Sequence, residues 1–193
     1  MFEKKQYQPL MVCIGGWPGS GKTTIAGHLQ HHLEHSVHLD SDAMRKKMFQ
    51  IAITQKLPET AYSAENTKRL IAYAGQEVSK ILKEGKDVIV SATFFDEDSR
   101  AYQQNIAEKA NASFAGFMLE APYEILQQRI RSRMLDSHAH NPSDADLKVL
   151  ERIFTGDFGL YQAPWLTINA DRHVADIVEE IKQRLAHKKS LVK

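Results

Sequence analysis

The feature that most constrains this sequence is a glycine-rich stretch of eight residues, Gly16-Trp17-Pro18-Gly19-Ser20-Gly21-Lys22-Thr23. It follows the apolar run Leu10–Ile14 and precedes apolar residues at helical spacing, so it is expected to join a strand to a helix. Glycines let the backbone approach an anion closely, and the helix N-terminus adds N–H groups. Every constrained position of the pattern G-x-x-x-x-G-K-[ST] is met, which predicts a phosphate-binding loop rather than an incidental turn.

Within this loop we expect the side chains to divide between nucleotide and metal. Lys22 is predicted to reach the β- and γ-phosphates of a nucleoside triphosphate, and the Thr23 hydroxyl to bind Mg²⁺. The residues expected to contact the nucleotide are Gly16, Trp17, Pro18, Gly19, Ser20, Gly21, Lys22, Thr23 and Thr24.

Strand-like apolar runs alternate with helical patterns along the whole chain. The runs predicted as strands are Leu10–Ile14, Ser36–Leu39, Val88–Val90, Phe114–Leu119 and Leu166–Ile168. The helices predicted between and after them include 63–83, 99–110, 123–134 and 172–187. This alternation predicts the α/β class, a three-layer α/β/α fold with a five-stranded parallel sheet. Ligands in such sheets bind at the carboxyl ends of the strands, where the motifs below fall.

Two aspartates, Asp40 and Asp42, come directly after the second predicted strand. A carboxylate there can face the γ-phosphate and accept the proton of an attacking hydroxyl, and we expect this catalytic role for Asp42. Alternatively, these residues only cap a short helix, which would begin at Asp42 and run through Phe49. Arg45, one turn further on, is expected with Asp40 on the substrate side.

The third predicted strand ends in Ser91, where many phosphate-loop proteins place an acid for the Mg²⁺ shell. Either Asp40, Asp42 or Glu120 then supplies a carboxylate through water, or Thr23 and the nucleotide hold the metal. Two more candidates for acceptor contact follow, Thr93 and Arg100. The alternatives are that Thr93 only caps the strand end and that Arg100 lies on a solvated helix face.

Arg129 and Arg133 lie four residues apart and therefore on one helix face. An arginine over the γ-phosphate gains strength in the transition state of phosphoryl transfer, which suits Arg133, while Arg129 can stack on the nucleotide base. Arg131 points elsewhere and is expected on the surface. The polar stretch 136–142 indicates a mobile lid, spanning about 124–150, that excludes water when it closes.

Composition narrows the choice of function. The 25 basic and 24 acidic side chains leave a net charge of +1, which gives no bulk electrostatic case for binding nucleic acid or a membrane surface. The single cysteine, Cys13, excludes a disulfide framework and a cysteine-built zinc site. His28, His32 and His35 share a helix face and are expected to be solvated. With no signal peptide or membrane-span pattern, we expect one cytoplasmic domain over residues 1–193.

Taken in order, these motifs resemble the predicted P-loop kinases of the AAA_33 type. The resemblance covers about residues 10–168 and includes the Gly-Lys-Thr loop, Ser41-Asp42-x-x-Arg45, Ala92-Thr93-Phe94, Arg129-x-x-x-Arg133 and Ser143-Asp144-Ala145-Asp146. It implies ATP and Mg²⁺ as ligands. In the related polynucleotide kinases the acid of the D-x-x-R segment is the general base, which matches Asp42, and the lid pair matches Arg129 and Arg133. The family's third strand usually ends in Asp-Ala-Thr, whereas this chain has Ser91.

We therefore expect an ATP-dependent kinase that phosphorylates a hydroxyl of a small molecule or a nucleotide sugar. Lys22, Asp42 and Arg133 are its expected catalytic residues. Three alternatives stay open at this point: a polynucleotide 5′-hydroxyl kinase, a zeta-toxin-like kinase acting on an activated amino sugar, and an ATP-binding switch with little or no transfer. The last is the interpretation that Ser91 favours.

Overall fold

Five parallel strands form the central sheet of the protein. The computed structural model describes residues 7–135, 143–154, 161 and 163–191. The strands lie in the order β2-β3-β1-β4-β5 and are β1 (Leu10–Gly16), β2 (Ser36–Asp40), β3 (Asp87–Ser91), β4 (Ser113–Glu120) and β5 (Trp165–Asn169). All four neighbouring pairs are parallel, which confirms the predicted α/β class and the five-stranded sheet.

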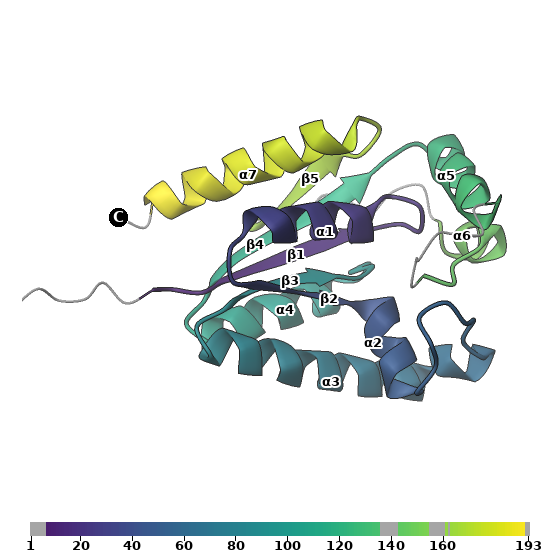
Figure 1. Cartoon of the computed structure of the whole chain (residues 1–193), viewed down its shortest axis with the longest axis horizontal. Coiled ribbons are helices and arrows are strands. Elements are labelled where there is room, and N and C mark those ends of the chain that lie inside the picture. Colours follow the sequence, from purple (N-terminus) through teal and green to yellow (C-terminus); the bar gives the residue numbers. More distant parts are fainter. Residues whose placement is uncertain (1–6, 136–142, 155–160, 162, 192–193) are drawn as a thin grey trace, which may run out of the picture.

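Helices cover both faces of the sheet and crowd its carboxyl end (Figure 1). One face is covered by α1 (Lys22–His32) and α7 (Val174–Leu191), the other by α3 (Ala64–Lys83) and α4 (Glu97–Lys109). At the carboxyl end of the strands lie α2 (Ser41–Met48), the short 3₁₀ helix η1 (Glu59–Tyr62), α5 (Tyr123–Leu135) and α6 (Leu147–Ile153). The three-layer arrangement is therefore the one predicted.

The central strand β1 is apolar because both of its faces are covered. All of its residues are buried. Val12 and Ile14 belong to the core shared with α1 and α7, whereas Met11 and Cys13 belong to the core shared with α3 and α4. This two-sided burial explains why the strand has no polar alternation. Burial also raises the pKa of the Cys13 thiol well above its usual range, which makes this cysteine inert.

Side-chain caps begin several of the helices, and two of these caps correct a predicted helix start. Asp40, not Asp42, is the N-cap of α2, since its carboxylate accepts hydrogen bonds from the backbone N–H groups of Asp42 and Ala43. Similarly, Asp96 caps α4, which therefore begins at Glu97, two residues before the predicted start. Because Asp40 caps α2, the Asp42 side chain is not needed as the helix cap and can have a different role.

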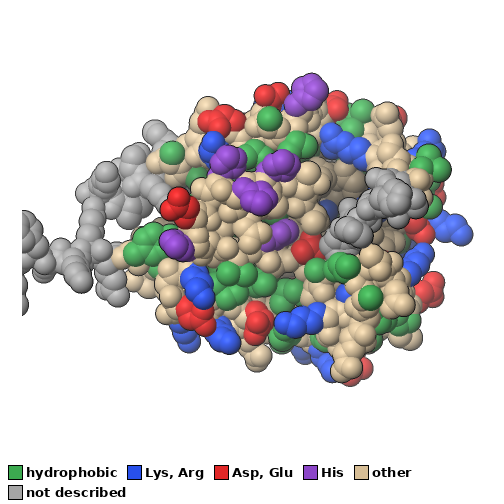
Figure 2. Space-filling model, in the orientation of Figure 1, with side chains coloured by type: hydrophobic (Ala, Val, Ile, Leu, Met, Phe, Trp, Pro, Cys, Tyr) green, Lys and Arg blue, Asp and Glu red, His purple; other side chains and the backbone are tan. Residues whose placement is uncertain are grey.

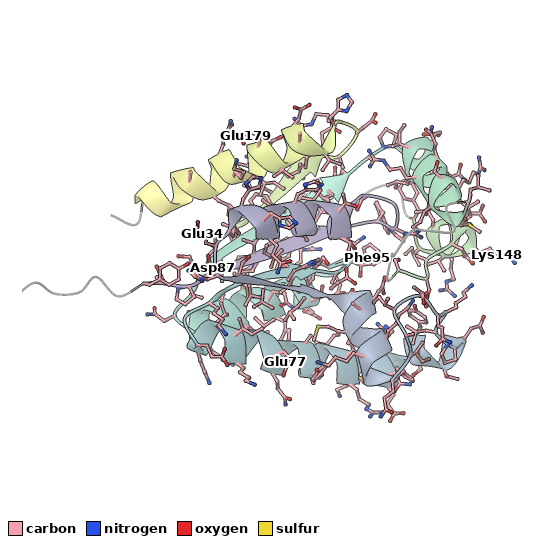
Figure 3. All side chains as sticks on the ribbon, in the orientation of Figure 1. Glu34, Glu77, Asp87, Phe95, Lys148 and Glu179 are labelled. Carbon is pink, nitrogen blue, oxygen red and sulfur yellow. The ribbon has the colours of Figure 1, made fainter. Side chains whose placement is uncertain are left out.

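Asp87 and Phe95 mark the two opposite ends of the sheet. At the amino end of β3, Asp87 accepts hydrogen bonds from Tyr7 and from the Leu10 backbone, and thereby joins the start of the chain to the sheet. Phe95, which follows the carboxyl end of β3, lies at the opposite end (Figure 3). Among the helices described, none is both long and apolar enough to span a membrane.

Candidate functional site

A cavity of about 1200 Å³ lies at the carboxyl ends of the strands. Drug-sized ligands occupy pockets of roughly 300–1000 Å³, so this one has room for a nucleotide and a second molecule. Its lining comes from the glycine-rich loop, α2, the segment 56–63, α5, the segment 143–153 and the residues after β5. The predicted site residues that line it are Pro18, Gly19, Ser20, Gly21, Lys22, Thr23, Thr24, Asp40, Asp42, Arg45, Thr93, Arg129 and Arg133.

The glycine-rich loop has a backbone that suits an anion. Gly19 and Gly21 have φ angles of +83° and +94°, in the left-handed region that favours glycine. The N-terminus of α1 has no side-chain cap and no acidic residue in its first turn. Its N–H groups and partial positive charge are therefore available to a phosphate.

Lys22 lies inside the loop, where burial and the nearby carboxylates change its pKa in opposite directions. Its Nζ donates hydrogen bonds to the carbonyls of Gly16 and Trp17, both at 2.9 Å. Burial lowers the pKa of Lys22 to about 8, and the carboxylates of Asp42 and Asp40 oppose that shift. The amine is therefore still largely cationic at neutral pH, as phosphate binding requires.

Gly16 and Trp17, both predicted to contact the nucleotide, are not among the residues that line the cavity. The Trp17 ring packs against Phe95, with centroids 4.5 Å apart, and against Phe154, at 5.2 Å. It belongs to a buried cluster with Leu126 and Ile130 beneath α5 and α6. What both residues offer to the site is a backbone carbonyl, as the acceptors of the Lys22 amine.

Asp40, predicted on the substrate side or as a source of the metal-shell carboxylate, lies beside Thr23. One carboxylate oxygen accepts hydrogen bonds from the hydroxyls of Thr23, at 2.9 Å, and Ser91, at 2.7 Å. The other accepts two backbone N–H groups of α2. Since four protein donors already engage the carboxylate, Asp40 suits the orientation of Thr23 and of a metal-bound water better than direct metal ligation. The described part of the chain holds no group of three or more His, Cys, Asp or Glu side chains placed to bind a metal.

Asp42 faces the cavity from the first turn of α2. Burial and the neighbouring charge of Asp40 raise its pKa above the ordinary value for aspartate, while a hydrogen bond from the Ser143 hydroxyl and the cations Lys22 and Arg45 oppose the rise. A carboxylate with a raised pKa is a stronger base than a surface aspartate. The geometry and the electrostatics therefore both suit proton abstraction.

Arg45 forms part of the cavity wall next to Asp42. It is only 8% exposed, its Nη1 donates to the Ala61 carbonyl at 2.6 Å, and its guanidinium lies 4.8 Å from the centre of the Tyr62 ring. Its Nε is buried and has no hydrogen-bond partner in the protein. Because a buried N–H without a partner is costly, this group marks a place for an acceptor oxygen.

Sequence reasoning missed a buried ion pair at this same end of the cavity. Lys46 Nζ lies 2.8 Å from Asp144 Oδ1, and the two side chains are 2% and 10% exposed. Asp144 also accepts hydrogen bonds from the Leu57 backbone, at 2.8 Å, and the Tyr62 hydroxyl, at 3.3 Å. Residue types alone gave no sign of this pairing, because its members are up to 98 positions apart.

Arg129 and Arg133 reach different parts of the cavity. Arg129 donates to the carbonyl of Ala170, just after β5, at 2.8 Å. Arg133 donates to the carbonyl of Ala145 and is influenced by the carboxylates of Asp42 and Asp144, which oppose a lowering of its pKa by burial. Arg131 is exposed, as predicted. The predicted mobile stretch 136–142 lies outside the described residues.

Arg100, predicted as an acceptor contact, is not among the residues that line the cavity. Its Nη1 donates to the carbonyls of Phe94 and Phe95, at 2.9 and 2.8 Å, and the guanidinium lies 5.1 Å from the centre of the Tyr161 ring. It thus holds the turn after β3. Thr93 does line the cavity, and its carbonyl accepts a hydrogen bond from the Gly16 N–H.

The histidines of α1 lie away from this site. His28, His31 and His32, with His35 just beyond the helix, are exposed and gather on one face of the molecule (Figure 2).

Charged groups of α6 such as Lys148 lie at the outer side of the cavity (Figure 3).

Comparison with known proteins agrees with this fold. A model of the AAA_33 family, described as an AAA domain, matches residues 11–155. The structure of a putative kinase from Chloroflexus aurantiacus J-10-fl is 25% identical in sequence, with a TM-score of 0.67, over 95% of this chain and 98% of that one. A gluconokinase from Sinorhizobium meliloti 1021 is 17% identical, with a TM-score of 0.63, over 98% and 99% of the two chains.

Two further comparisons extend this picture. A sugar kinase from Janibacter sp. HTCC2649 is 14% identical, with a TM-score of 0.66, over 93% of this chain and 95% of that one. An uncharacterized protein of Mycobacterium tuberculosis is 24% identical over 127 residues, which are 64% of this chain and 25% of that protein. The chain thus spans about a quarter of the length of the curated relatives it matches.

Proposed function

The chain belongs to the AAA_33 family and has the fold of P-loop kinases, and from this premise we propose that it transfers the γ-phosphate of ATP to a hydroxyl of a small molecule or a nucleotide sugar. The observation that carries the proposal is the placement of Asp42. A partly buried carboxylate with a raised pKa lines the cavity together with the amine of the phosphate loop. That is the arrangement that removal of a hydroxyl proton next to a phosphate requires.

The loop and the start of α1 supply the phosphate contacts in this proposal. Backbone N–H groups around Gly19 and Gly21 and the Lys22 amine hold the phosphates, and Arg129 holds the nucleotide near Ala170. Thr23, oriented by Asp40, would hold Mg²⁺. When bound, the metal neutralises charge on the phosphates.

Asp42 and the arginines near it carry the transfer. Asp42 accepts the proton of the acceptor hydroxyl as that oxygen attacks the γ-phosphorus. Arg133 stabilises the charge that spreads over the transferring group. The unpartnered Nε of Arg45 holds another oxygen of the acceptor and thereby orients its hydroxyl toward Asp42.

Two observations favour transfer over a switch that only binds ATP. Ser91 removes the carboxylate from the end of β3, but Asp40 places one within hydrogen-bond distance of both Ser91 and Thr23. The site therefore keeps a carboxylate charge, which comes from the end of β2 and not from the end of β3. The sugar kinase and the gluconokinase that share the fold lend support to an acceptor with a hydroxyl group.

The test is the variant Asp42→Asn, assayed with labelled ATP and a fractionated pool of metabolites and oligonucleotides. Transfer of label should fall by about 10²–10⁴-fold, with the dissociation constant for ATP little changed. The matched control is Glu59→Gln, which removes an acidic side chain elsewhere in the cavity lining. Undiminished transfer by the Asp42→Asn variant would refute the assignment, and label appearing only in oligonucleotides would show a polynucleotide acceptor.

A further inference from the structure

The proposed base already has a hydroxyl bound to it. The Ser143 side chain donates a hydrogen bond to the Asp42 carboxylate, and both residues line the cavity. Ser143 lies in the segment that leads into α6, about a hundred residues after Asp42 in the sequence. A serine hydroxyl here takes the position that the acceptor hydroxyl needs.

This contact is held by the anchored residues that follow Ser143. Asp144 is fixed by the buried Lys46 amine and by the Leu57 backbone N–H, each at 2.8 Å. The next carbonyl, that of Ala145, accepts a hydrogen bond from Arg133. The segment is therefore tied across the cavity by groups with little exposure, and its position does not depend on the Ser143 hydroxyl itself.

Cations suited to a phosphoryl group surround the same point. Lys22, Arg45 and Arg133 line the same cavity as Asp42 and Ser143, and each has its pKa influenced by the Asp42 carboxylate. A phosphate on Ser143 would carry close to two negative charges and three acceptor oxygens, which these cations would stabilise. The hydroxyls of Thr23 and Ser91 donate to Asp40 and not to Asp42.

From this geometry we propose that Ser143 is an internal phosphoryl acceptor, so that the protein phosphorylates itself at this residue when it holds ATP without an external acceptor. The proposal rests on the ATP site and the basic role of Asp42 described under the proposed function. Ser143 Oγ forms a bond to the γ-phosphorus, and the bond from that phosphorus to the oxygen bridging the β- and γ-phosphates breaks. ADP leaves with that electron pair, while the Ser143 proton passes to the Asp42 carboxylate and later to water.

The modification would occupy the acceptor end of the cavity. A phosphorylated Ser143 places its charge beside Asp42, which repels the carboxylate and takes up the space of an acceptor oxygen. The modified protein should therefore transfer phosphate to other acceptors more slowly than the unmodified protein does.

The experiment uses the full chain with labelled ATP and Mg²⁺ and no added acceptor, followed by intact mass measurement and peptide mapping. The expected result is one phosphoryl group per chain, located on Ser143, at a rate independent of protein concentration. Ser143→Ala should abolish the label, whereas Ser132→Ala, which alters another cavity-lining serine, should keep it. Asp42→Asn should slow labelling by about 10²-fold or more.

Three further measurements separate this inference from the proposed function. ATP binding and label transfer to the metabolite pool are measured with the same preparations, and thermal unfolding checks that Ser143→Ala is folded. If ATP binds and the pool is labelled but Ser143 is not, the internal acceptor is wrong and the proposed function stands. If ATP does not bind, both are wrong. Labelling whose rate rises with protein concentration would overturn transfer within one molecule.

Discussion

The two ends of the cavity are built in different ways. The proposed phosphate end is made of consecutive residues, 16–24, in which α1 begins without a side-chain cap and two backbone carbonyls accept hydrogen bonds from the Lys22 amine. The acceptor end is made of side chains from separate parts of the chain, joined by the pair of Lys46 and Asp144 across 98 positions. One end therefore depends on local backbone conformation, and the other on a buried charge that only the folded chain can pair.

This difference predicts that substitutions at one end of the cavity mainly change stability, whereas those at the other mainly change activity. At the acceptor end, removing one member of the ion pair leaves a buried charge without a partner, which threatens the fold. At the phosphate end, burial lowers the pKa of Lys22, so its charge is unfavourable to folding and its removal should reduce activity without reducing stability. Function and stability are thus separable along one cavity.

The largest effect is expected for Lys46→Met. The substitution leaves Asp144 charged and buried, and the free energy of unfolding should fall by about 3–5 kcal/mol, measured by urea denaturation. The control is Lys56→Met, because Lys56 is 71% exposed and lies 3.7 Å from Asp146, and this loss should stay below about 1 kcal/mol. The double variant Lys46→Met with Asp144→Leu should lose less than the single one, since no charge is then left unpaired. If Lys46→Met and Lys56→Met lose equal free energy of unfolding, the difference between the two ends of the cavity is refuted.

Lys22→Met should separate activity from stability. Transfer should fall by about 10²–10³-fold, because a cation over the phosphates is lost. The pKa of Lys22 is lowered to about 8 in the folded protein, below the value of about 10.4 for an unfolded chain. The folded state therefore binds the proton less well, and at pH 7 the charge opposes folding, so the Met variant should melt at a higher temperature. A lower melting temperature would contradict this sign.

Gly19→Ala tests the backbone of the phosphate end. Gly19 has a φ of +83°, and an added Cβ would lie 2.7 Å from the Leu126 carbonyl. The strain should lower stability by about 1–3 kcal/mol and weaken ATP binding, measured by calorimetry. Gly27→Ala is the matched control, because Gly27 lies inside α1 with no atom within 4 Å of an added Cβ. That change should raise stability by about 0.5–1 kcal/mol.

The smallest effect is a pH dependence of ATP binding. In the nucleotide-free protein Lys22 loses its proton as the pH rises through about 8. Below that pH the cation is present and affinity is constant, whereas above it affinity should fall by up to about tenfold per pH unit, with proton uptake on binding. Calorimetry in buffers of different ionisation enthalpy measures this uptake. For Lys22→Met, ATP affinity should not change over this pH range. If the affinity of the wild-type protein is equally constant, Lys22 is not the titrating group.

Local patterns predicted much of the molecule. Runs such as Val88–Val90 were correctly predicted as strands, since burial on both sheet faces demands continuous apolar residues. Asp42, Arg129 and Arg133 were predicted toward one cleft because parallel strands share a carboxyl end, and all three line the cavity. Sequence could not show that the Trp17 ring packs in a buried cluster or that Arg100 bonds the carbonyls of Phe94 and Phe95, because a residue type does not say which way its side chain turns.

By itself, the order of residues determined the phosphate loop, the class of fold and the edge of the sheet where ligands bind. These follow from short-range physics: glycine conformation, helix N–H groups and the spacing of apolar side chains. The tertiary structure alone decided that Asp40 serves Thr23, that Lys46 meets Asp144, and that Ser143 reaches Asp42. Such contacts join residues far apart in the chain, and their partners are chosen by which segments the packed core brings together.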